Sequence, residues 1–149
     1  MRFYIIPCLL AAAILAGCKN NSGNGAGPAT NNVLKDTAQF TTIQWLDSTS
    51  KDFGKIQEGQ QLEVTFRFKN TGDKPLIIQK VQPSCGCTIA DQPKEPIAPG
   101  AEGLIRANFN STHHTGINHK TLFVFANTKG STAHSLQFMV EVTPAEKKS

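Results

Sequence analysis

The sequence lacks the motifs that identify common enzymes. Its 149 residues contain no Gly-x-Ser-x-Gly nucleophile motif, no glycine-rich phosphate loop and no His-Glu-x-x-His zinc motif. Acidic side chains in turns and at strand ends usually accept hydrogen bonds from nearby backbone N–H groups or are solvated. Four acidic residues lie at such predicted positions: Asp52, Glu58, Asp73 and Asp91. We therefore predict a protein that is not an enzyme and that carries no cofactor.

Two further absences narrow the class of protein. No stretch places apolar residues at helical spacing over the length of a helix, so helical folds are excluded. Lys and Arg number 15 against 11 Asp and Glu, a net charge of +4, but the basic residues are scattered singly rather than gathered in a stripe. The aromatic residues also fall on core-like positions and not between basic ones. Nucleic acid is therefore not an expected partner.

The N-terminal stretch is typical of an export signal. Residues 1–17 hold one basic residue and an apolar run, and small residues precede Cys18. The run is shorter than the about 20 apolar residues that span a bilayer, so a secretory signal is favoured over a transmembrane helix. Residues 15–18 (Leu-Ala-Gly-Cys) resemble the bacterial lipobox, which implies cleavage between Gly17 and Cys18 and acylation of Cys18, for example with palmitate.

The remainder divides into a tether, one domain and a short tail. Residues 18–38 are expected to be the lipidated cysteine and a flexible tether, because Lys19 to Asn32 includes no large apolar residue. Residues 39–144 are the predicted domain, and 145–149 form a charged tail. Lys19 in place of Asp after the cysteine resembles the enterobacterial signal for the outer membrane. We expect an envelope lipoprotein held to the lipid bilayer through acylated Cys18, with its domain facing the periplasm.

The domain has the pattern of an all-β fold. From about Thr41 onward, apolar residues recur with period two between turn residues, as between Leu62 and Phe68. Further segments of this kind are expected at 76–81, 104–110, 121–126 and 136–142, and the stretch from Ile43 to Ile56 resembles a first strand broken at Asp47 to Lys51. About seven short strands separated by turns predict a single immunoglobulin-like antiparallel β-sandwich.

Cys85 and Cys87 are the cysteines left once Cys18 is acylated and the signal containing Cys8 is removed. Glycine at position 86 permits a backbone conformation that brings their Cα atoms within the disulfide range of about 4.4–6.8 Å. Oxidising compartments favour such a bridge. A structural bridge, or a pair of thiols packed in a turn, is one interpretation of the pair.

Two sharper interpretations of the cysteine pair remain open. Two thiolates suit Cu(I) or Zn, and His113, His114 or His119 would complete the coordination if the 111–119 loop folds beside them. Alternatively, the pair cycles between dithiol and disulfide, although the spacing differs from the Cys-x-x-Cys of redox enzymes.

Several strings resemble the bacterial family catalogued as domain of unknown function 1573. The family is similar in fold to major sperm protein and Hydin-type domains, and the resemblance implies fold and location but no activity. His113-His114 departs from the family pattern, in which basic residues are more usual. The strings cover nearly the whole predicted domain: Asp52 to Gly59, Phe66 to Leu76, Ser84 to Thr88, Pro96 to Gly100 and Phe109 to Ser111.

These observations lead to two functional hypotheses. The first is a non-catalytic binding or structural module that presents an edge strand or loop to another envelope protein. The second is a periplasmic copper, zinc or thiol-redox protein centred on Cys85 and Cys87.

Overall fold

A computed structural model describes residues 34–145 of the chain. The predicted signal peptide and its cleavage site, Cys18 and the tether as far as residue 33 lie outside the described residues, as does the tail from residue 146. No helix within residues 34–145 is long and apolar enough to cross a membrane.

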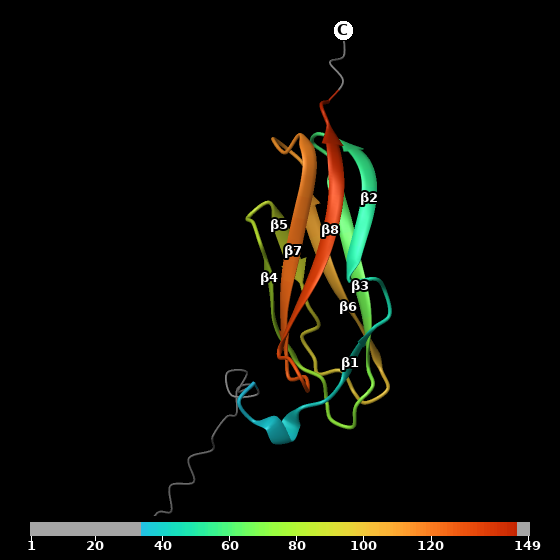
Figure 1. Cartoon of the computed structure of the whole chain (residues 1–149), viewed down its shortest axis with the longest axis vertical. Coiled ribbons are helices and arrows are strands. Elements are labelled where there is room, and N and C mark those ends of the chain that lie inside the picture. Colours follow the sequence, from blue (N-terminus) through green and yellow to red (C-terminus); the bar gives the residue numbers. More distant parts are fainter. Residues whose placement is uncertain (1–33, 146–149) are drawn as a thin grey trace, which may run out of the picture.

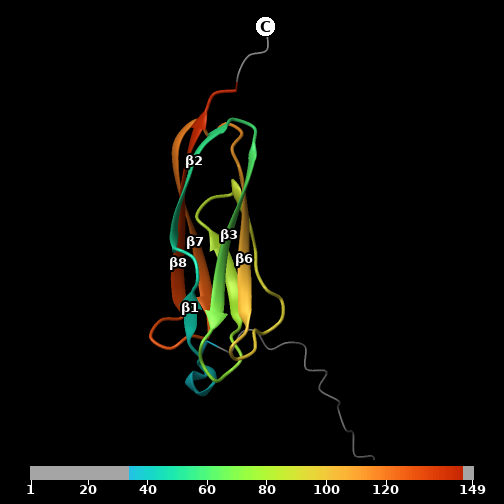
Figure 2. The same ribbon diagram turned by 90° about the vertical axis from the view of Figure 1, so that its right-hand side faces the viewer.

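Two four-stranded sheets pack face to face, as Figures 1 and 2 show from two sides. One sheet has the strand order β1-β3-β6-β5 and the other β2-β8-β7-β4. The bounds are η1 (Thr37–Gln39), β1 (Ile43–Trp45), β2 (Ser50–Gln57), β3 (Gln61–Asn70), β4 (Ile78–Pro83), β5 (Thr88–Asp91), β6 (Glu102–Asn110), β7 (Gly116–Ala126) and β8 (Ala133–Thr143). The predicted sandwich class is confirmed.

The core follows from the period-two pattern of the sequence. Side chains alternate between the two faces of a strand, so every second residue points between the sheets. On β3 these residues are Val64, Phe66 and Phe68, all fully buried. The rings of Phe109 on β6 and Phe138 on β8 meet edge to face across the two sheets, with centroids 6.0 Å apart. Burial of these apolar faces holds the sheets together.

The first expected strand is two strands in different sheets. β1 pairs antiparallel with β3, whereas β2 pairs with β8 in the parallel direction. The chain crosses between the sheets at the predicted break. There the Asp47 carboxylate accepts hydrogen bonds from the Arg67 guanidinium at 2.8 and 3.1 Å and from Lys51 Nζ at 3.1 Å. Because the chain keeps its direction after crossing, β2 runs beside β8 in parallel, which a simple antiparallel sandwich does not include.

β5 is a strand that the sequence pattern did not indicate. It pairs antiparallel with β6 over Thr88 to Asp91. Its inward residues are the small Thr88 and Ala90, and its one large apolar residue, Ile89, points outward and is 73% exposed. A strand without inward-facing large residues gives no alternating signal. It therefore escaped prediction.

Buried carboxamides organise the loops at the end of the sandwich that carries η1. The Asn127 side chain accepts from the Ile77 backbone N–H at 2.7 Å and donates to the carbonyls of Gln39 and Pro75 at 2.7 and 2.9 Å. Asn70 has a similar role, because its Nδ2 donates to the backbone carbonyls of Lys74 and Ile97 at 2.8 and 2.9 Å. These hydrogen bonds satisfy backbone N–H and C=O groups that have no partner in the strand pairing.

Replacing Asn127 with Ala should lower the free energy of unfolding by about 3 kcal/mol, since three hydrogen bonds of about 1 kcal/mol each are lost at a buried position. Urea unfolding measures this loss. The matched control is Asn108→Ala on the exposed face of β6, where the change should stay within about 0.5 kcal/mol. Equal losses in the two variants would contradict the structural role assigned to Asn127.

Candidate functional site

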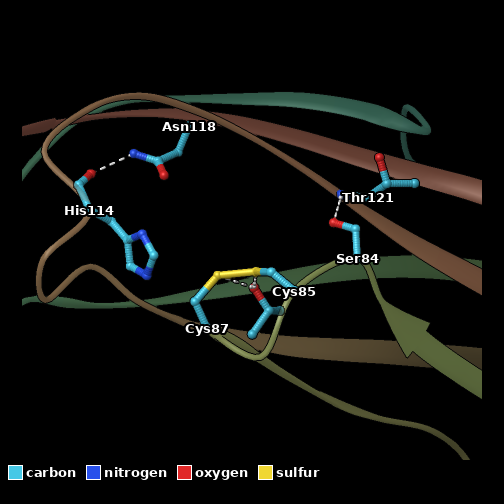
Figure 3. The surroundings of a disulfide bond; sticks show 7 residues. Ser84, Cys85, Cys87, His114, Asn118 and Thr121 are labelled. Atoms are coloured by element: carbon cyan, nitrogen blue, oxygen red, sulfur yellow. Dashed lines mark hydrogen bonds between the residues drawn. A yellow bond between two sulfur atoms is a disulfide. The ribbon is translucent and has the colours of Figure 1, made fainter.

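The cysteines lie in the turn where the chain passes from β4 in one sheet to β5 in the other (Figure 3). Hydrogen bonds hold this turn on both sides. The Ser84 backbone N–H donates to the Thr121 carbonyl on β7 at 2.8 Å, and the Thr121 N–H donates to Ser84 Oγ at 3.2 Å. The Asn110 N–H at the end of β6 donates to the Cys87 carbonyl at 2.9 Å. The turn is thus fastened to both sheets by backbone groups.

Cys85 and Cys87 form a disulfide, with Sγ atoms 2.01 Å apart and Cα atoms 5.4 Å apart. Both residues are half-buried, and Gly86 between them is exposed. The Thr88 hydroxyl lies 3.8 Å from Cys85 Sγ and 4.0 Å from Cys87 Sγ. Thr88 itself is only 4% exposed, so its hydroxyl is held in place beside the bridge.

A hollow of about 230 Å³ opens beside the disulfide on the outer face of the first sheet. Its floor consists of carboxamides from β3 and β6, and its walls come from the cysteine turn, β5 and the loop after β6. The lining residues are Gln61, Gly86, Cys87, Ile89, Asn108, Asn110, Thr112 and His114. Carboxamides, one hydroxyl and one imidazole therefore surround the exposed Ile89 side chain and Cys87.

The structure brings one of the three loop histidines to the cysteines. His114 lines the hollow with Cys87, and its ring lies 5.7 Å from that of Phe109. His113 adopts a positive φ of 60° and turns away, with its backbone N–H donating to Glu58 Oε1 at 2.9 Å. His119 lies on β7 of the other sheet, exposed and opposite Met139. The adjacent residues His113 and His114 therefore lie in different surroundings: His114 lines the hollow, and His113 contacts Glu58.

The predicted metal ligands do not assemble into a set of three. Within residues 34–145, no group of three or more His, Cys, Asp or Glu side chains is placed to hold a metal ion. Thiolates, and not a disulfide, bind soft metals. The arrangement as it stands offers a bridged sulfur pair and a single imidazole.

The carboxamides of the hollow are residues that sequence reasoning missed. Gln61, Asn108 and Asn110 occupy the outward positions of strands whose inward residues form the core, so their exposure was readable from the alternation. That they meet the cysteine turn depends on the pairing of β5 with β6, in which Ile89 lies opposite Asn108. No local pattern in the sequence predicts the pairing of β5 with β6.

The surroundings of Asp47 and His134, which both lie outside the hollow, lower the pKa of each group. Hydrogen bonds from Arg67 hold the pKa of Asp47 well below its usual range. Burial lowers the pKa of His134, which is half-buried near the start of β8 and lies 2.7 Å from the buried Thr128 hydroxyl through Nε2. Trp45 packs beside it at 5.9 Å between ring centroids. Both groups therefore link folding to pH without touching the candidate site.

The chain belongs to the family described as protein of unknown function (DUF1573), whose family model matches residues 43–142. No curated protein sequence matches the chain.

Solved structures support the same fold. A protein of unknown function from Porphyromonas gingivalis is 18% identical with a TM-score of 0.62, and the match covers 70% of this chain and 48% of that one. The seventh PapD-like domain of human CEP192 is 12% identical with a TM-score of 0.50, covering 74% and 89%. A family 123 glycoside hydrolase from Clostridium perfringens is 11% identical with a TM-score of 0.53, covering 72% and 28%. The chain thus spans about half the length of the Porphyromonas protein.

Stability should depend on pH through His134. Because burial lowers its folded-state pKa, the folded protein binds the proton less readily than the unfolded chain does. The stabilisation is therefore complete above about pH 6.5 and declines as the pH falls below that value. Urea unfolding from about pH 7.5 to about pH 5 should show this decline in the wild type and a weaker one in His134→Gln. The exposed control His119→Gln should keep the wild-type slope, and an equal flattening in both variants would contradict the assignment.

Proposed function

We propose that the chain is a membrane-anchored envelope lipoprotein whose sandwich is a non-catalytic binding module, with the hollow beside Cys85 and Cys87 as its recognition surface. One observation supports this proposal. The described chain begins at one end of the sandwich, and the hollow lies toward the other end. η1 marks the beginning at one end in Figure 1, whereas the ends of β6 and β8 lie at the other. A tether attached before η1 would leave the hollow facing away from the lipid.

The composition of the hollow favours recognition over catalysis. Carboxamides both donate and accept hydrogen bonds, and the exposed Ile89 adds an apolar contact at their side. Binding surfaces commonly combine a few placed polar groups with an apolar anchor. Another envelope protein, presenting polar backbone or side-chain groups, is the partner that such a surface suits.

The edge strands of the second sheet, β2 and β4, are less suited to recognition by strand addition. Gln92 Nε2 donates to the carbonyls of Ile78 and Gln79 on β4, each at 3.1 Å. On β2, the Ser48 hydroxyl bonds both backbone groups of Ser50, and Gln60 Oε1 accepts from the Gln57 N–H at 2.8 Å. Side chains thus already occupy backbone groups at two sheet edges, a common protection against pairing with other chains. The two modes expected were an edge strand and a loop, and the occupied edges of this sheet favour recognition through a loop.

Soft-metal binding is a second candidate, because Cys87 and His114 line one hollow. It requires the bridge to open first, since copper or zinc binds thiolates. Metal analysis of the full exported chain before and after reduction separates the cases. Stoichiometric copper or zinc that appears only in the reduced protein and is lost in His114→Ala would support it.

The lipid anchor is tested by Cys18→Ala in the full chain. We expect this variant to lose labelling by a palmitate analogue and to leave the membrane fraction, because Cys18 carries the acyl groups. Cys8→Ala is the matched control and should retain both labelling and membrane association. Membrane association that persists in Cys18→Ala would contradict the anchoring proposal.

The recognition surface is tested with a photo-crosslinking amino acid placed at Asn108 in the full chain in living cells. We expect a discrete cross-linked protein from this position and none from Gln137, an exposed position on the outer face of the other sheet. The discrete product should weaken when Ile89→Arg is added, because a bulky charge then stands at the hollow. Identical patterns from positions 108 and 137 would contradict the assignment of the hollow.

A further inference from the structure

We propose that the Cys85–Cys87 disulfide undergoes thiol–disulfide exchange with cysteine-bearing proteins of the envelope, and that the incoming thiolate attacks Cys87 Sγ from the hollow. The proposal does not rest on the binding role proposed above, because a small thiol is enough to test it. Three features of the turn support it: a bridge that the fold does not need, an open approach to the sulfur atoms, and a fixed hydroxyl beside both.

The disulfide contributes little to the stability of the fold. A disulfide stabilises a protein mainly by restricting its unfolded chain, and the effect grows with the length of the closed loop. Here only one residue separates the two cysteines. The turn is also fastened independently, through the bonds from Ser84 to Thr121 on β7 and from Asn110 to Cys87. Opening the bridge should therefore leave the turn and both sheets in place.

The sulfur pair can be approached from outside. Gly86 is exposed, and a Cβ atom built on it would meet no atom within 4 Å. The hollow adjoins the same residue and Cys87, so a partner's backbone and a cysteine side chain have room there. Figure 3 shows the His114 ring on this side, directed toward the bridge, where an imidazole can accept the proton of an incoming thiol. Accessible disulfides are the ones that exchange readily.

The buried Thr88 hydroxyl supplies the remaining group. At 3.8 and 4.0 Å from the two sulfur atoms, it can donate a hydrogen bond to whichever becomes a thiolate. A hydrogen bond to the charged form favours that form, and a better stabilised thiolate is a faster leaving group. Thr88 is thus a positioning and stabilising residue for the departing Cys85 sulfur.

The exchange balances in two steps. A partner thiolate forms a bond to Cys87 Sγ while the bond between Cys87 and Cys85 breaks, and Cys85 leaves as a thiolate that takes a proton from solvent. A second thiolate of the partner then attacks the partner's own sulfur in the mixed disulfide and releases Cys87. The partner's dithiol loses two electrons and two protons and becomes a disulfide, while Cys85 and Cys87 gain the two electrons, take two protons from solvent and become a dithiol. With a partner disulfide, the same steps run in reverse.

The first test is reduction of the oxidised, full exported chain by reduced glutathione under native conditions, followed by alkylation and mass spectrometry. We expect wild-type protein to be reduced without loss of its circular dichroism spectrum. Thr88→Val keeps the shape of the side chain but removes the hydroxyl, and it should slow reduction by about tenfold. Thr121→Val, the same change at the partner of Ser84, should not alter the rate.

The second test identifies the sulfur that exchanges. In Cys85→Ala the remaining Cys87 thiol should form a mixed disulfide with oxidised glutathione about fivefold faster than Cys85 does in Cys87→Ala. Reduction of the wild type only in denaturant, loss of the folded spectrum on reduction, an unchanged rate in Thr88→Val, or faster reaction at Cys85 would each overturn the proposal. None of these outcomes bears on the cross-links from position 108, so the two proposals fail separately.

Discussion

Two sheets that share one core must be joined by segments that cross between them, and this constraint shapes the whole molecule. The shared core is built from alternating apolar residues, and Phe109 and Phe138 meet within it from opposite sheets. Protein interiors are close-packed, so neither sheet can move without disturbing the other. Each crossing segment must therefore leave one sheet and enter the next while satisfying its backbone hydrogen bonds at the boundary.

The chain resolves two of these crossings with different chemistry. Between β1 and β2, the Asp47 carboxylate receives Arg67 and Lys51, and the resulting hydrogen bonds lower its pKa. Between β4 and β5, neutral backbone hydrogen bonds hold the crossing, and the Cys85–Cys87 disulfide lies beside them. At the charged crossing, the Asp47 carboxylate is fully engaged by Arg67 and Lys51. The neutral crossing leaves Gly86 and the sulfur pair open to the surface, and for that reason the candidate site forms there.

Much of this architecture was predictable from the sequence, because the side-chain period of a strand is fixed by its geometry. The half-buried β3 and the break at Asp47 to Lys51 both follow from the alternation and its interruption. The parallel pairing of β2 with β8 was not predictable, since it depends on which neighbour the chain meets after it crosses. β5 was also missed, because Thr88 and Ala90 are too small to give a core signal.

The site was predictable only in its cysteines. That His114 and not His113 faces them depends on the positive φ at His113, which directs the two neighbours apart. The carboxamides join the hollow through strand register, a long-range property that no local pattern contains.

Amide hydrogen exchange at Ser84, Asn110 and Thr121, compared between the oxidised and the reduced protein, tests whether backbone bonds hold the cysteine turn. We expect equal protection in both states, because these bonds join the turn to both sheets. Loss of protection on reduction would mean that the disulfide holds the turn instead.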